Sequence, residues 1–284
     1  MSILQNKIDF AAIVSIKLAN PNGDPLNGNR PREDYDGFGI LSDVSIKRKL
    51  RNRLQDMGER IFVQSDDRSD DGKTSLKDRA DGCEELKKEI DKKKDANRDE
   101  FAKIACKEWI DVRSFGQVFA FKGAEVSVGV RGPVSIQQAV SVAPVDIVSM
   151  QITKSVNSEA GKDSKASDTM GMKHYVSFGL YVIRGSINCQ LAEKTGFTDA
   201  DAEKIKEALC SLFENDASSA RPEGSCEVCE LIWWRHAEKT PKTTSAKLQR
   251  SIHITAKVDE PHEFGDYEVS IDPSDCQPEV LILV

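Results

Sequence analysis

Cationic side chains without nearby carboxylates are the first feature that suggests a chemical role for this chain. Five lysines and arginines and no acid occur in residues 45–53. At helical spacing, Lys47, Arg48 and Arg51 form one stripe, and the hydroxyl of Ser45 adds a further donor. Such donors hold the phosphates of a nucleic acid without reading its bases. A charged helix face that contacts only water is the alternative explanation.

Two further arginines and an aromatic residue occur in segments that we predict to be strands. Arg113 and Arg131 have apolar neighbours, so each must form an ion pair or reach solvent at a groove. A structural ion pair and a phosphate contact both satisfy this requirement. Phe115 can stack on a base, a contact worth roughly 1–3 kcal/mol, or it can pack in the core.

Cys226 and Cys229 form the only C-x-x-C pair in a chain of seven cysteines. A structural zinc site needs four ligands, and no second pair of ligands at metal-binding spacing accompanies this one. We therefore expect thiols at a turn that leads into a strand, with no metal and no cofactor. An odd number of irregularly spaced cysteines is typical of a reducing compartment.

Hydrophobic periodicity predicts the elements that position these residues. Alternation over residues 7–18 is typical of a half-buried strand, and a helix begins at Ser42 or Asp43 and ends at Gly58. Residues 61–108 carry mixed charge and a thin apolar stripe, so we expect an insertion that packs lightly on the body. The remaining elements that we predict are strands at 117–121, 126–134, 145–153, 175–187 and 228–234, and a helix at 198–213. Without insertions the order is β-α-β-β-α-β, the ferredoxin-like arrangement that RNA-recognition modules also use.

The charge of the chain is unevenly distributed. Its 284 residues carry a net charge of −7, and eight acids against one lysine give residues 255–284 that same charge. The remainder is therefore neutral and can carry a basic face. Apolar residues make up 39% and charged residues 31%, which is typical of a soluble protein without a membrane span. The N-terminal residues lack the layout of a signal peptide, so we expect a cytoplasmic protein.

Several segments resemble the backbone subunits of CRISPR Cascade complexes, subtype I-C, which belong to the RAMP superfamily. The most specific likeness is the asparagine-rich loop at 20–32 followed by residues 39–51 with the basic helix. The likeness runs in matching order along most of the chain and is weakest in 61–108 and 255–284. Further segments that carry it are 111–116 and 129–137, similar to middle strands of the family, and 170–175, similar to the base of its projecting hairpin.

The resemblance implies an α+β fold shaped like a hand. A modified ferredoxin-like, RRM-like palm would form a single domain over 1–284, with a helical finger insertion at 59–112 and a thumb hairpin at 154–174. Copies would stack along one guide RNA (crRNA), and each thumb would displace a base at regular intervals. The exposed bases would pair with target DNA in antiviral defence, while other Cascade subunits recognise the flanking motif and recruit a nuclease. Such a subunit is not an enzyme.

Two more groups of residues are candidate RNA contacts on this resemblance. Turn chemistry explains the asparagines, glycines and prolines of the first loop but not its arginines, so the loop is predicted to contact RNA or a neighbouring copy. In the thumb, two methionines on a polar tip can wedge between bases or fold back onto the body. The loop contacts are Asn20, Asn22, Asn27, Asn29, Arg30 and Arg32, and the thumb contacts are Lys154, Met170, Met172, Lys173 and His174, the last of which is equally explained as a hydrogen-bonding residue.

Two rival functions remain open from the residues alone. Related backbone subunits of type III complexes cut RNA with a carboxylate in the loop after the first strand, where this chain has Asp24 and Asp34. A metal-assisted RNA-cleaving subunit is therefore the first alternative. A general RNA-binding scaffold that binds as a monomer is the second.

Overall fold

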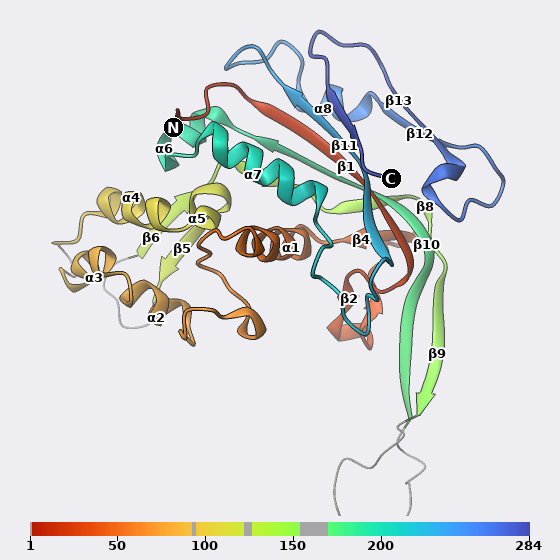
Figure 1. Ribbon diagram of the computed structural model, residues 1–284, viewed down its shortest axis with the longest axis horizontal. Coiled ribbons are helices and arrows are strands. Elements are labelled where there is room, and N and C mark those ends of the chain that lie inside the picture. The colour runs from red at the N-terminus through yellow and green to blue at the C-terminus, as the bar shows by residue number, and fades with distance from the viewer. Residues whose placement is uncertain (1, 93–94, 122–126, 154–169) are drawn as a thin grey trace, which may run out of the picture.

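The computed structural model describes residues 2–92, 95–121, 127–153 and 170–284, and a large antiparallel sheet lies at its centre (Figure 1). Eight strands form this sheet in the order β14-β11-β1-β10-β8-β4, with β7 and β9 also pairing with β10. Helices cover it, so the fold is mixed α and β. The strands are β1 (Ile8–Ala19), β4 (Phe38–Leu41), β7 (Val134–Ile136), β8 (Ala139–Pro144), β9 (Ile147–Thr153), β10 (Met170–Ile187), β11 (Cys226–Arg235) and β14 (Glu279–Ile282).

Strand β1 is central, between β10 and β11, and both of its faces are buried. The predicted strand at 7–18 is confirmed, but the expectation that only one face is buried is wrong. Phe10 and Ala12 belong to one apolar cluster, and Ala11 and Ile13 belong to another on the opposite face. The alternation of apolar residues predicts one buried face. The second face also carries small and apolar residues, and these are covered as well.

Helices α1 (Asp43–Asp56) and α7 (Asp199–Cys210) cover the same face of the sheet. The side chain of Ser42 caps α1 by accepting a hydrogen bond from the backbone N–H of Ser45 at 3.2 Å. Ile46, Leu50 and Leu54 are fully buried and form the core-facing stripe of this helix, and the predicted helix is confirmed. The other face of the sheet is covered by elements that the sequence did not predict, α8 (Ser245–Arg250), β12 (Ile252–Ala256) and β13 (Tyr267–Ile271).

The charged insertion has an apolar core of its own, contrary to the prediction that it packs lightly. The ring of Phe62 lies 4.7 Å from that of Trp109 and 5.0 Å from that of Phe119, and Phe101 lies 5.1 Å from Phe119. Aromatic rings bury large areas, so a few of them are enough to form a core although the apolar stripe of residues 61–108 is thin. Its elements are α2 (Leu76–Asp81), α3 (Glu84–Asp91), α4 (Arg98–Glu108), α5 (Ile110–Phe115), β5 (Gly116–Ala120) and β6 (Ser127–Arg131).

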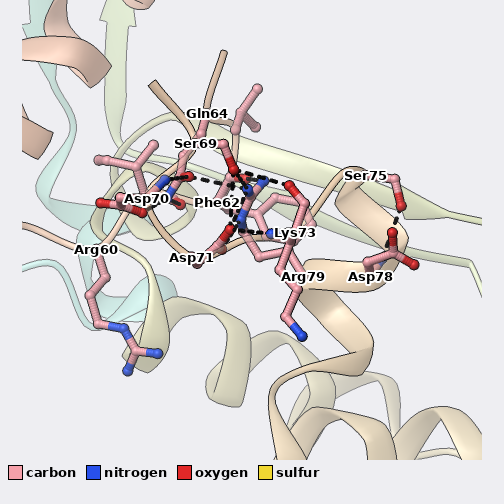
Figure 2. Close-up of polar contacts among 12 residues, drawn as sticks. Arg60, Phe62, Gln64, Ser69, Asp70, Asp71, Lys73, Ser75, Asp78 and Arg79 are labelled. Carbon is pink, nitrogen blue, oxygen red and sulfur yellow. Dashed lines mark hydrogen bonds and ion pairs between the residues drawn. The ribbon is translucent and has the colours of Figure 1, made fainter. Parts of the chain in front are cut away.

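A buried arginine holds the irregular loop of this insertion in place. Arg79 is 6% exposed; its Nη1 donates to the carbonyl of Phe62 at 2.9 Å and its Nη2 to the carboxylate of Asp71 at 2.9 Å (Figure 2). Asp71 in turn accepts from the backbone N–H of Lys73 at 2.9 Å. The hydrogen bonding from Arg79 lowers the pKa of Asp71 to about 2, although burial opposes ionisation.

Strands β9 and β10 continue beyond the sheet as a two-stranded ribbon that projects from the body (Figure 1). His174 pairs with Ser149, and Met172 pairs with Gln151, so these four residues share one face. The predicted pairing of two long strands at this point is confirmed. Residues 154–169, which include the predicted contact Lys154 and most of the predicted hairpin tip, lie outside the described residues. No helix in the described ranges is long and apolar enough to cross a bilayer.

Candidate nucleic-acid interface

The sheet face that an RNA-recognition module would use is covered in this chain. Leu248, Ile252 and Tyr267 from α8, β12 and β13 pack against Leu180 and Trp234 of the sheet. Such modules stack bases on exposed aromatics of the sheet, and Trp234 is fully buried here. Any contact with nucleic acid must therefore lie away from this face of the sheet.

The cations of α1 mostly have partners within the chain. Lys47 pairs with Asp43 at 3.0 Å, with the lysine side chain 26% exposed. The guanidinium of Arg48 donates to the carbonyl of Val63 at 2.7 Å, and the hydroxyl of Ser45 donates to a backbone carbonyl one turn earlier, at 2.9 Å. Of the predicted stripe, Lys47 keeps the accessible charge, since an exposed i,i+4 pair is weak and exchangeable.

Arg51 and Phe115, predicted as separate RNA contacts, are joined in one structural latch. The Nε of Arg51 donates to the buried carboxylate of Asp111 at 3.0 Å, and its guanidinium lies 5.2 Å from the centre of the Phe115 ring. The same carboxylate accepts the backbone N–H groups of Phe62 at 2.7 Å and Val63 at 3.1 Å. The latch ties α1 to the start of the insertion, which is a structural use of both side chains.

Arg113 lies in helix α5 rather than in the predicted strand. It makes a bidentate pair with Asp201 of α7, at 2.8 and 3.2 Å. Burial raises the pKa of Asp201, but the hydrogen bonds from Arg113 and Thr198 outweigh this effect and hold the pKa below its usual value. Of the two alternatives left open for Arg113, the structure shows the ion pair.

Arg131 ends strand β6, opposite Gly116 of β5, which confirms its predicted strand setting. Its side chain is exposed and forms no ion pair within the ranges that the structure describes. It is therefore free to meet a phosphate, although it stands on the insertion and away from the ribbon.

The first loop after β1 is organised by its asparagines. The Nδ2 of Asn20 donates to the carbonyl of Asn29 at 2.6 Å, and the Oδ1 of Asn22 accepts the backbone N–H of Ser42 at 2.9 Å. Asn22 therefore joins this loop to the start of α1. Arg32 pairs with Asp24 at 3.3 Å and remains 38% exposed. These contacts are the turn chemistry expected of asparagine, and they leave the arginines at the surface.

Arg30 and His174 meet at the root of the ribbon through a residue that the sequence analysis missed. The guanidinium of Arg30 donates to the hydroxyl of Ser149 at 3.0 Å, and this hydroxyl lies 2.9 Å from the Nδ1 of His174. Lys173, the residue before His174, lies on the face of β10 opposite to that of His174. Only the register of β9 against β10 places Ser149 there, so no local sequence signal marks it. We call Arg30, Ser149 and His174 the root cluster.

Met170 and Met172 are exposed, at 57% and 54%, on the face of the ribbon that carries His174. They do not fold back onto the body, which was the alternative left open for them. Met150 and Ile152 are similarly exposed on the opposite face, at 48% and 47%, so both faces of the ribbon carry exposed apolar side chains.

The two cysteines at C-x-x-C spacing lie within strand β11, not at the turn before it. Burial raises the pKa of Cys226 to about 11 and that of Cys229 to about 12. Thiols of this kind are protonated at neutral pH and behave as small apolar side chains.

The carboxylates considered for RNA cleavage take part in turns. Asp24 accepts the backbone N–H of Leu26 at 3.2 Å and pairs with Arg32. Asp34 accepts the backbone N–H groups of Asp36 at 3.0 Å and Phe38 at 2.9 Å. Both carboxylates therefore have a structural role, which is to stabilise turns of the chain.

The fold is that of a mixed α and β protein built on a large antiparallel sheet with a projecting ribbon. The chain belongs to the CRISPR-associated protein Cas7 family, whose profile matches residues 6–272. A relative from Haloferax volcanii, described as CRISPR-associated protein Cas7, is 25% identical over 282 residues and covers 93% of this chain and 73% of its own. Chains of two solved CRISPR RNA-guided surveillance complexes, one of them pre-nicking, are 16% identical with a TM-score of 0.49. Both matches span 84% of this chain, and 80% and 72% of theirs.

Proposed function

We propose that this protein is the guide-RNA-binding backbone subunit of a type I-C Cascade complex in the cytoplasm. Copies assemble along one crRNA and present its bases to target DNA, and the chain carries out no chemical step itself. Membership of the Cas7 family over residues 6–272 supports the CRISPR role. The loop at 20–32 and residues 39–51, which run from β4 into the basic helix α1, carry the resemblance to subtype I-C and support the subtype.

The root cluster is the observation on which the RNA-binding proposal depends. A cation, a hydroxyl and an imidazole from three separate segments converge where the ribbon leaves the body. Among the described residues, the nearest carboxylate to Arg30 belongs to Glu33, at 3.9 Å, and both side chains are about a third exposed. An ion pair of that length between partly exposed side chains contributes little to the stability of the fold. A phosphate can therefore replace the carboxylate of Glu33 with little loss of free energy.

The hand-shaped architecture is part of the proposal. Strands β11, β1, β10 and β8 lie side by side, with α1 and α7 on one face, and this arrangement supports a ferredoxin-like palm. The separate aromatic cluster of the insertion supports a finger module, and it extends past the predicted limit of 112 to Val128. The ribbon of β9 and β10 supports a thumb at 154–174.

A sedimentation experiment tests the function. Purified protein is run with single-stranded RNAs of increasing length, and we expect particles whose mass grows in steps with RNA length. A monomer that binds short RNA without ordered growth would favour the general scaffold, and loss of RNA integrity with a divalent metal would favour the cleaving subunit. Asp24→Ala is the control for cleavage. It should stop the loss of RNA if this carboxylate cleaves RNA, and it should leave the assembly unchanged if the subunit is not catalytic.

A further inference from the structure

Helices α4, α6 (Cys189–Thr195) and α7 border a groove of about 690 Å³ that carries excess positive charge. Lys103 and Lys107 of α4 are 72% and 77% exposed, and their nearest carboxylates lie at 4.0 and 3.7 Å on side chains that are themselves at least half exposed. Lys194 of α6 is exposed and has no carboxylate partner in the described part of the chain. We call these three residues the lysine groove.

The remaining charges of the groove are already neutralised within the chain. Arg113 is bound to Asp201, and Lys204 is bound to Glu59. Glu193, the other acid of the lining, pairs with Lys239 outside the groove. Lys194 therefore has no carboxylate partner among the described residues, and the exposed pairs of Lys103 and Lys107 with Glu100 and Glu85 are weak and exchangeable. The lining keeps an excess of cations, and a solvated groove of this kind attracts an acidic surface.

An acidic surface lies on the turn between β12 and β13. Asp259, Glu260 and Glu263 are exposed there and form no ion pair with the described residues. Val258, beside them, is 46% exposed. We call residues 258–263 the acidic turn. Its conformation is held by Asp266, which accepts the backbone N–H groups of His262 at 2.8 Å and Glu263 at 3.1 Å.

The two surfaces lie at opposite ends of the molecule. In Figure 1, α4 and α6 stand at the left, and the β12–β13 hairpin stands at the right. They therefore cannot meet within one chain. Two different surfaces at opposite ends join copies head to tail, and such a contact repeats without limit unless it closes into a ring.

We propose that the lysine groove of one copy receives the acidic turn of the next copy. This inference rests on the proposed function, because copies bound to one RNA are held at high effective concentration and a modest ionic contact then suffices. Complementary charge sets the orientation and spacing of partners more than their affinity. The contact gives the row of copies a direction that RNA binding alone does not impose.

Charge reversal on each surface, and then on both together, tests the contact. K103E/K107E reverses the groove, D259K/E263K reverses the turn, and the combined variant restores opposite charges at every junction with the parental net charge. K87E/K88E, on exposed lysines of α3 outside the groove, is the matched control. Step-wise growth on long RNA is followed by sedimentation, and binding of one copy to a short RNA is followed by fluorescence anisotropy.

We expect each single-surface variant to need at least about tenfold more protein for ordered growth, and the combined variant and the control to behave like the parent. Short-RNA binding should stay within about twofold in all of them. Normal growth of both single-surface variants would overturn the docking contact while leaving the proposed function intact. A loss of short-RNA binding in K103E/K107E would show that the groove holds nucleic acid instead.

Sedimentation of the RNA-free protein at low salt tests the contact independently of the proposed function. Weak self-association should disappear in each single-surface variant and return in the combined one. The same weak association in all variants, or none at any concentration, would reject the contact. Failure of the parent to bind RNA at all would reject the proposed function without altering this result.

Discussion

Arg30 donates a hydrogen bond to Ser149 at 3.0 Å across 119 positions of the chain, and this contact ties the first loop to the projecting ribbon. His174 lies 2.9 Å from the same hydroxyl on the adjacent strand. The loop and the ribbon therefore present their polar side chains to one place. The following predictions concern this cluster, the structural ion pairs near it and the two faces of the ribbon.

Removing the root cluster should weaken RNA binding and its dependence on salt. R30A/H174A is expected to lower affinity for single-stranded RNA and to reduce the slope of log K against log salt by about one for each phosphate that the protein no longer binds. Fluorescence anisotropy at several salt concentrations measures both quantities. R250A, at an exposed arginine of α8, is the control. An unchanged slope in R30A/H174A would show that Arg30 does not contact phosphate.

Breaking the latch should cost stability. R51A leaves the carboxylate of Asp111, which is 1% exposed, without its cation. Loss of one partner from a buried pair costs roughly 3–5 kcal/mol, so the free energy of unfolding in urea should fall by about that amount. K47A, one turn earlier on the same helix, removes an exposed pair and should cost about 0.5 kcal/mol or less. Equal losses in the two variants would contradict the latch.

The contact between Arg79 and Asp71 should appear in the pH dependence of stability. The pKa of Asp71 is about 2 in the folded chain against an ordinary value of 3.8, so the contact stabilises fully above pH 4. This contribution is lost as the pH falls from 4 towards 2. The difference in free energy of unfolding between the parent and D71N should shrink over that range. A difference that stays constant would refute the assignment.

Arg79→Lys is a companion to that measurement. Lysine keeps the charge but loses the fork that reaches Asp71, Phe62 and Gln64 together. We expect this variant to be less stable than the parent above pH 4, with a weaker pH dependence.

The two faces of the ribbon should differ in their effect on bound RNA. M170S/M172S removes apolar side chains from the face of His174 and should disturb the periodic reactivity of bases in chemical probing of bound RNA. M150S/I152S makes the same change on the opposite face, where the residues are also exposed, and is the matched control. Neither change should alter stability by more than about 0.5 kcal/mol. The same probing pattern in M170S/M172S and the parent would argue against a wedge.

Periodicity alone was sufficient to predict the long central strand, the capped basic helix, the helix before the last central strand and the pairing of two strands in the ribbon. These elements have strong local signals, such as the Ser42 cap and the stripe of Ile46, Leu50 and Leu54. Periodicity was not sufficient to predict the core of the insertion, because Phe62, Trp109 and Phe119 are far apart in sequence. Elements α8, β12 and β13 were also missed, because their apolar residues pack on a distant sheet face.

Residue types and spacing were thus enough to show that arginines and lysines cluster around residues 30–51, since composition and helical period are local properties. Which of these cations remain available for a ligand depends on carboxylates brought from elsewhere. Asp111 occupies Arg51 and Asp216 occupies Lys49, across 60 and 167 positions of the chain. Among the described residues, Arg30 has only the neighbouring Glu33 as a carboxylate partner, at 3.9 Å, and it reaches Ser149 as well. Ion pairing depends on distance in space, and only the packed chain sets that distance.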